Sequence, residues 1–175
     1  KIVVPFSPES LLSGCDFQLQ PGETLWYERS FTLPEGFVKE RVLLHFGAVD
    51  QSARVLVNDC PVGGHEGGYL PFTLDITAAL RPGVNRLTVA VTDRTDEGPH
   101  AYGKQKRRRG GIWYTAQSGI WQTVWLESVP QTYIRGLKIT PLFDEGAVEV
   151  RVHLSAPAAG EAIVHCGDAV AARAP

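Results

Sequence analysis

Apolar residues recur at every second position in much of this 175-residue chain, and this alternation restricts the folds that the chain can adopt. In residues 86–92, Leu87, Val89 and Val91 fall on one face of an extended backbone, and polar residues fall on the other. Residues 53–57 alternate in the same way. Because almost no segment shows a helical period, we expect an all-β protein.

One strand is expected to be buried on both faces, because residues 41–49 are apolar almost throughout. Turn-forming residues separate the predicted strands, at positions 33–36, 58–59, 81–83 and 144–146. Only residues 75–80 fit a helical turn, with Asp75 or Thr77 as its N-cap. Short strands at this spacing predict a β-sandwich or jelly roll.

A domain boundary is predicted near residue 130, after the apolar strand expected at residues 121–126. Residues 1–130 hold about eight predicted strands, which is enough for one sandwich. Residues 131–175 hold three candidate strands, around residues 133–140, 147–154 and 161–166. Three strands leave open edges and an uncovered face, so this part is predicted to be the truncated start of a second sandwich.

The charge balance and the cysteines exclude several classes of protein. The net charge of −2 does not favour nucleic acid, and no apolar run approaches the ~20 residues that a membrane span needs. Cys15, Cys60 and Cys166 lie far apart, without the spacing of a metal site or of a disulfide framework. With no signal-like start visible, we expect a cytoplasmic protein without metal or cofactor that binds neither nucleic acid nor membrane.

Basic residues are concentrated at positions 104–109, which carry five of the chain's 17 lysines and arginines. A solvated basic loop, or one docked on an acidic neighbour, is the simplest interpretation, because no second basic stripe accompanies it. Aromatic residues follow directly, and broad aromatic rings stack well on the apolar faces of sugars. The candidate substrate contacts in this region are Lys104, Gln105, Trp113 and Tyr114.

Two further tryptophans, Trp121 and Trp125, are expected on one strand together with Thr123. In that arrangement they line one sheet face, either as core or as a domain interface. Exposure of both rings would predict self-association, and we therefore expect a homo-oligomer as a further partner.

The segment Gly64–Phe72, GHEGGYLPF, sets a histidine and a glutamate beside two glycines. The glycines supply the backbone freedom of a tight loop, and a proline at position 71 suits the start of a strand. His65 and Glu66 are expected to hold this loop by hydrogen bonds to backbone groups, with direct sugar contact as the alternative. A metal site is disfavoured, because neighbouring side chains diverge on a strand.

No catalytic constellation is evident in the sequence. Hydrolysis of a glycosidic bond usually takes two carboxylates that flank the bond, and only Glu66 has a rigid aromatic setting. Signatures of serine hydrolases, zinc proteases and nucleotide-binding loops are also absent from the sequence. No catalytic residue is therefore predicted in this chain.

Several ordered blocks strongly resemble the N-terminal sugar-binding domain of glycoside hydrolase family 2, which includes β-galactosidases, β-glucuronidases and β-mannosidases. The resemblance extends over roughly residues 5–130. The blocks that carry it are residues 25–31 (LWYERSF), 42–50 (VLLHFGAVD), 55–58 (VLVN), 64–77 (GHEGGYLPFTLDIT), 85–91 (NRLTVAV) and 118–127 (SGIWQTVWLE).

The resemblance implies a jelly-roll sandwich of the galactose-binding type in residues 1–130. It also implies that residues 131–175 begin the immunoglobulin-like domain that follows in the family. The parent protein would be a retaining glycosidase whose catalytic glutamates lie in a further TIM barrel, which needs ~250 residues of its own. This chain would then act as a scaffold, with carbohydrate and the downstream domains of the same protein as its partners.

One position departs from the family pattern. Well-known members carry an aspartate shortly before the Ser-Gly-Ile motif, and in an ungapped match that position is Trp113. Either the loop has another shape or the sugar contact has changed, so the identity of the sugar does not transfer. A free-standing carbohydrate-binding module and a purely structural or interaction domain are the alternative interpretations.

Overall fold

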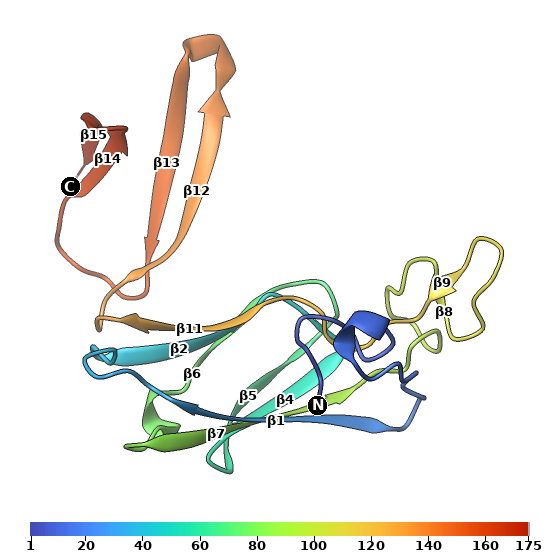
Figure 1. Ribbon diagram of the computed structural model, residues 1–175. Helices are drawn as coiled ribbons and strands as arrows, with labels where there is room; N and C mark the ends of the chain where they lie inside the picture. The colour runs from blue at the N-terminus through green and yellow to red at the C-terminus, as the bar shows by residue number, and fades with distance from the viewer. Residues whose placement is uncertain (175) are drawn as a thin grey trace. The chain divides into compact units, whose positions relative to one another are not determined.

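The computed structural model describes residues 1–174, and the chain divides into two compact units, Lys1–Ser128 and Val129–Pro175. Figure 1 shows that strands dominate both. The first unit contains, in chain order, η1 (Leu11–Ser13), β1 (Thr24–Thr32), β2 (Arg41–Phe46), β3 (Val49–Asp50), β4 (Ser52–Val57), β5 (Cys60–Glu66), β6 (Phe72–Asp75), η2 (Thr77–Ala79), β7 (Val84–Thr92), β8 (Gln105–Lys106), β9 (Tyr114–Thr115), β10 (Gly119–Ile120) and β11 (Val124–Val129).

Two sheets face each other in this unit (Figure 1). One has the order β1-β7-β4-β5, with each neighbouring pair antiparallel, and the other has the order β11-β2-β6. The central strand β2 buries Val42, Leu43, Leu44 and Phe46, as the continuous apolar run predicted. The all-β sandwich expected for this part of the chain is confirmed.

The core between the sheets consists of the alternating residues that the sequence pattern identified. Val55 and Val57 of β4 meet Val89 and Val91 of β7, all with at most 1% of their surface exposed. Burying such side chains stabilises a fold by roughly 1.5–3 kcal/mol each relative to leaving them exposed. This core holds the loops at the ends of the sheets in place.

A two-residue turn at Asn58–Asp59 joins β4 to β5, with positive φ at both residues. The Asn58 amide donates to the carbonyl of Ala79 and to Oδ1 of Asn85, each at 2.8 Å. Asn85, only 1% exposed, in turn accepts from the backbone N–H of Arg81 at 2.9 Å. These bonds satisfy a polar network buried at this end of the sandwich.

The expected helical turn is present as η2, a 3-10 turn at Thr77–Ala79. Ile76 occupies its N-cap position, without a capping side-chain bond. Asp75 instead accepts hydrogen bonds from the backbone N–H of Thr77 at 3.0 Å and from its hydroxyl at 2.5 Å. Neither Asp75 nor Thr77 is therefore the N-cap. The two residues flank Ile76 in the sequence and form hydrogen bonds with each other.

The second unit consists of two antiparallel hairpins. They are β12 (Ile134–Leu142) with β13 (Ala147–Leu154), joined through η3 (Phe143–Glu145), and β14 (Ala162–Cys166) with β15 (Ala169–Ala174). The sequence predicted three strands, and β15 was missed. Its sequence, AVAARA, has only one β-branched residue and no polar alternation, so pairing with β14 rather than propensity makes it a strand.

Candidate functional site

Loops at one end of the first unit bring together polar and aromatic residues that are far apart in the sequence. We call this group the end cluster; it consists of Glu9, Asp50, Tyr69, Asp93, Gln105, Ser118 and Trp121. Asp50 is the last residue of β3, Asp93 follows β7, and Ser118 precedes β10. Because Gly119 pairs with Asp50 in the β3–β10 ladder, the end of one strand and the start of the other lie side by side.

The motif Ser118-Gly119-Ile120 holds the end cluster to the core. Gly119 has φ +77, and a side chain there would collide with the Tyr27 hydroxyl, so only glycine fits. The Ile120 N–H donates to the Tyr27 hydroxyl at 3.2 Å. Burial raises the pKa of Tyr27 to about 12, so the hydroxyl remains a neutral acceptor.

Three carboxyl groups of the end cluster are removed from water. Burial raises the pKa of Asp50 to about 7, with further contributions from the charges of Asp93 and Glu9. Burial also raises the pKa of Asp93, which is 5% exposed, and that of Glu9. Asp50 is therefore partly protonated at neutral pH, where an exposed aspartate would have released its proton.

Hydrogen bonds inside the protein occupy two of these carboxyl groups. Glu9 accepts from the Ser118 hydroxyl at 2.7 Å and from its backbone N–H at 3.1 Å, while Asp93 accepts from the Thr95 N–H at 2.7 Å. The Ser118 hydroxyl also bonds to Asp93. The Ser118 hydroxyl has one proton, so it can donate to only one of Glu9 and Asp93. It bonds to both when the other carboxyl group is protonated and donates to the Ser118 oxygen.

Asp50 differs, because no hydrogen bond to its carboxyl group is recorded in residues 1–174. It lies directly against Gly68, where any side chain would overlap the carboxyl group. Trp121 Nε1 donates to the Gly68 carbonyl at 2.8 Å, and the Trp121 ring meets the Tyr69 ring edge-on at 6.4 Å. Asp50, Tyr69 and Trp121 thus form one polar and aromatic corner.

The basic loop, which we define as residues 104–115, adjoins this corner. Gln105 bonds to the Tyr69 side chain, and Gln105 Oε1 accepts from the Gln117 N–H at 2.7 Å. Strands β8 and β9 close the loop as a short parallel pair, which Figure 1 shows projecting beyond the sandwich. The candidate residues Lys104, Gln105, Trp113 and Tyr114 therefore lie on one structural element.

The aromatic residues of the basic loop are presented in different ways. A tight turn pairs Gly110 with Trp113 through two backbone bonds of 3.1 Å, and the Lys106 ammonium lies 4.1 Å from the centre of the Trp113 ring. Tyr114 is 71% exposed. Trp113 is thus half-buried and backed by a cation, whereas Tyr114 faces solvent.

The expectation for His65 and Glu66 is wrong in its detail. Both residues belong to strand β5 rather than to a loop. Glu66 accepts a hydrogen bond of 2.5 Å from the Ser52 hydroxyl, and the His65 ring stacks on Phe72 at 4.6 Å, with no hydrogen-bond partner for Nδ1. Cross-strand pairing and ring stacking, not bonds to backbone groups, fix these two residues. No contact with the basic loop is recorded for them in residues 1–174.

The prediction that Trp121 and Trp125 share a strand is also wrong. The strand begins at Val124, so Trp121 lies in the preceding loop and belongs to the end cluster. Trp125 is 45% exposed and stacks on His45 at 4.8 Å, on the outer face of the sheet. Pairing with β2 places Val124 and Leu126 against the core, which turns Trp125 outward.

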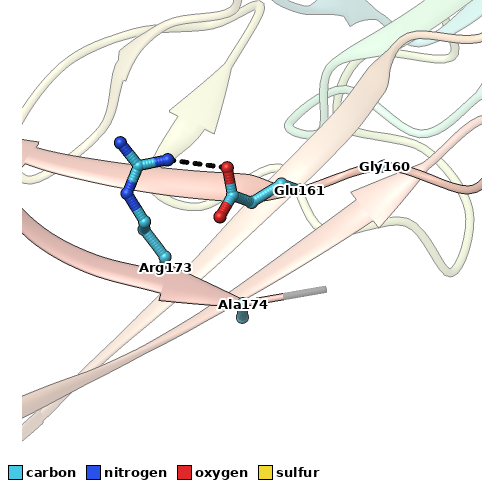
Figure 2. A pocket seen from close by; sticks show the side chains of 4 residues that line it. All are labelled: Gly160, Glu161, Arg173 and Ala174. Atoms are coloured by element: carbon cyan, nitrogen blue, oxygen red, sulfur yellow. Dashed lines mark hydrogen bonds and ion pairs between the residues drawn. The ribbon is translucent and has the colours of Figure 1, made fainter.

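The surface hollows of the second unit carry no comparable chemistry. Figure 2 shows one that is lined by Gly160 and Glu161, just before β14, and by Arg173 and Ala174 of β15; Arg173 and Glu161 point toward each other and form an ion pair of 2.7 Å. In the part of the chain that the structure describes, no group of three metal-ligating side chains is present. Within the same residues, no helix has the length and apolarity to cross a membrane.

Of the end cluster, only Gln105 was predicted as a site residue; Glu9, Asp50, Tyr69, Asp93, Ser118 and Trp121 were not. Asp50 and Ser118 lie within blocks that carry the family resemblance, yet neither block indicates that Asp50 pairs with Gly119, the residue after Ser118. An aspartate at the end of a strand is a usable signal, because it lies at the end of the sheet; Asp50 is the last residue of β3, and Asp93 directly follows β7.

Comparison with known protein families identifies a match to the model described as "Glycosyl hydrolases family 2, sugar binding domain" over residues 16–130. The chain is 33% identical over 112 residues to a β-galactosidase of Thermoanaerobacter pseudethanolicus, covering 63% of this chain and 14% of that protein. It is 29% identical over 154 residues to the β-glucuronidase of Homo sapiens, covering 75% of this chain and 23% of that protein. The chain thus spans less than a quarter of each of these two relatives.

Solved structures of β-glucuronidases also superpose on this chain. A β-glucuronidase of an uncultured Clostridium species superposes with a TM-score of 0.67 at 31% identity, over 86% of this chain and 28% of that one. A β-glucuronidase of Faecalibacterium prausnitzii superposes with a TM-score of 0.72 at 25% identity, over 99% of this chain and 33% of that one.

Proposed function

Because the chain belongs to glycosyl hydrolase family 2, through its sugar-binding domain, we propose that it is the non-catalytic, carbohydrate-facing part of a longer retaining glycosidase. The relatives named above are a β-galactosidase and β-glucuronidases, so we assign the parent to this type. The observation that carries the proposal is the match to the sugar-binding model over residues 16–130, the part of the chain that includes nearly all of the end cluster and the whole basic loop.

The chemistry of the end cluster supports binding rather than bond cleavage. A retaining glycosidase needs a nucleophilic carboxylate and an acid about 5 Å apart, both reaching the sugar. Asp93 is buried and bonded to Thr95, and Glu9 is bonded to Ser118, so neither presents a free carboxylate. Asp50 and the hydroxyl of Tyr69 are suited instead to hydrogen bonds with sugar hydroxyls, beside the aromatic surface of Trp121.

A hydrolysis assay tests the proposal directly. Residues 1–175 alone should release no nitrophenol from nitrophenyl β-glucuronide or nitrophenyl β-galactoside. Protein translated from the same gene past residue 175 should hydrolyse at least one of the two. Hydrolysis by residues 1–175 alone, or inactivity of the longer protein on both substrates, would contradict the proposal.

A free-standing carbohydrate-binding module is the second candidate, favoured by the exposure of Tyr114 beside the cation-backed Trp113 ring. Titration of residues 1–175 with methyl galactoside, glucuronide and mannoside separates the two functions. A module should bind one of them with millimolar affinity or better, whereas a scaffold that completes its site with other domains should show no measurable binding.

The second unit is proposed to begin an immunoglobulin-like sandwich. Its two hairpins expose several large apolar side chains, including Ile139 at 61% and Phe143 at 94%. Hairpins of this kind are marginal alone and are stabilised when further strands cover them. We also propose self-association through exposed aromatic residues such as Trp125, which sedimentation at several protein concentrations would detect.

A further inference from the structure

We infer that the basic loop is a binding site for the acidic groups of a carbohydrate, that is, for carboxylate or sulfate oxygens on a sugar chain. The inference rests on the proposed function, since it specifies which carbohydrate the chain faces. It concerns a part of the glycan that lies on this chain, rather than the sugar whose bond is cleaved.

The charge of the basic loop is mostly uncompensated. Arg107 is the one basic residue of the loop with recorded acidic partners in residues 1–174: it bonds to Asp96 and to Glu97, each at 2.6 Å. No ion pair is recorded there for the remaining four, which are Lys104, Lys106, Arg108 and Arg109. The sequence also contains no aspartate or glutamate between Glu97 and Glu127. The loop thus presents about four positive charges in a chain whose net charge is −2.

The paired arginine and the unpaired cations have different roles. Arg107 ties the basic loop to the segment after β7, and in doing so it neutralises the nearest acidic side chains. Lys104 and Arg108 are exposed. Arg109 donates to the Thr115 hydroxyl at 3.0 Å, a neutral partner that leaves its charge available. The loop is therefore held in place by one cation and presents the others to solvent.

Aromatic surface accompanies this charge, and the combination fits an acidic sugar. The Lys106 ammonium lies over one face of the Trp113 ring, 4.1 Å from its centre, and Tyr114 stands exposed on the same loop. The apolar face of a pyranose stacks on such a ring, while a carboxylate or sulfate on the sugar pairs with the neighbouring cation. Neutral sugars would use only the first of these contacts.

A nucleic acid is the other polymer that a cluster of positive charges attracts. Nucleic-acid binding draws on basic residues spread over a face or a groove, and outside this one loop the chain is net acidic. A short acidic glycan requires only the loop.

Calorimetric titration of residues 1–175 tests the inference with four defined probes at low salt. The probes are a hyaluronan tetrasaccharide with carboxylates only, a heparin tetrasaccharide with carboxylates and sulfates, neutral cellotetraose, and a single-stranded oligonucleotide of similar charge. At least one acidic tetrasaccharide should bind, and the comparison of the two identifies which oxyanion is preferred. Binding should weaken as salt rises, because exposed charges are screened.

The double variant Lys104→Ala/Arg108→Ala should weaken binding of the acidic tetrasaccharide about fivefold to tenfold, as expected for the loss of two exposed ion pairs. The matched control is Arg29→Ala/Arg54→Ala, which removes the same charge from two exposed arginines of β1 and β4 and should leave affinity unchanged. Circular dichroism of both variants verifies that each is folded.

Three results would overturn the inference: no binding of either acidic tetrasaccharide, equal weakening by both double variants, or oligonucleotide binding as tight as glycan binding. None of these results affects hydrolysis by the longer protein, which tests the proposed function. Conversely, an inactive longer protein would refute the proposed function while leaving the measured glycan affinity in place.

Discussion

Trp113 combines an aromatic face with a neighbouring cation, and its ring is held by the Gly110–Trp113 turn. If it contacts substrate, the change Trp113→Ala in the longer protein should raise KM roughly threefold to tenfold with little change in kcat, because stacking contributes to binding throughout the reaction. Steady-state kinetics on a nitrophenyl glycoside would measure this.

The matched control for this prediction is Trp26→Ala. Trp26 is 59% exposed on β1, outside the end cluster and the basic loop, so its removal should leave both kinetic constants unchanged. Unchanged kinetics for Trp113→Ala would exclude Trp113 as a substrate contact.

Asp50 makes the stability of the chain depend on pH. Since burial raises its pKa to about 7, the folded state binds more protons than the unfolded state between about pH 4 and pH 7. The free energy of unfolding should therefore fall as pH rises through this window. Asp50 should contribute about 2 kcal/mol of that fall, roughly half of the full linkage value, because the side chain retains partial access to water.

Urea denaturation at several pH values would measure this effect. In the Asp50→Asn variant, the free energy of unfolding should fall less steeply with rising pH. Part of the fall should remain, because the pKa values of Glu9 and Asp93 are also raised. The control is Asp16→Asn, at an exposed position with φ +49, which asparagine tolerates. Its free energy of unfolding should depend on pH as steeply as that of the unaltered chain. An Asp50→Asn variant with the wild-type slope would contradict the prediction.

At the scale of elements, two-residue strands hold the basic loop. Strands β8 and β9 share only two paired positions, so the Arg107 bonds to Asp96 and Glu97 supply much of the remaining restraint. Arg107→Ala should increase trypsin cleavage after Arg108 and Arg109 severalfold, because local opening exposes the backbone to protease. Global stability should change by about 1 kcal/mol or less, because both ion pairs lie near the protein surface.

The control Arg151→Ala removes another exposed ion pair, the one to Glu149 on the same strand β13. Its cleavage rate after Arg108 and Arg109 should match that of the unaltered chain. An equal rate for Arg107→Ala would show that the β8–β9 pairing alone restrains the loop.

At the scale of the whole molecule, the core cluster lies entirely within the first unit. A domain with its own core folds independently in general, so residues 1–130 alone should unfold cooperatively and with a midpoint close to that of the longer chain. Thermal denaturation followed by circular dichroism would show this. A truncated chain without a cooperative transition would refute the predicted boundary near residue 130.

The core and most strands of the first unit were predictable from local pattern. Alternation in β4 and β7, the apolar run of β2 and the turn at Asn58–Asp59 each state a local preference that the fold satisfies. The strand boundary before Trp125 was not predictable, because pairing with β2, not propensity, decides where β11 begins. The alanine-rich β15 was missed for the same reason.

One part of the candidate site could be predicted from the sequence, and the other part could not. The residues of the basic loop are adjacent in sequence, so composition alone identified Lys104, Gln105, Trp113 and Tyr114 as a group. The end cluster draws on Glu9, Asp50, Asp93 and Ser118, which strand order and not sequence spacing brings together.

By itself, therefore, the sequence determined that this chain is a β-sandwich with a cationic, aromatic loop, because backbone period and charge density are local properties. Only the tertiary structure decided that the carboxyl groups of Glu9, Asp50 and Asp93 lie together in the end cluster, away from water. It also decided that His65 stacks on Phe72 instead of bonding to backbone groups. Proximity between distant segments and exclusion of water are properties of the packed fold, and no local pattern encodes them.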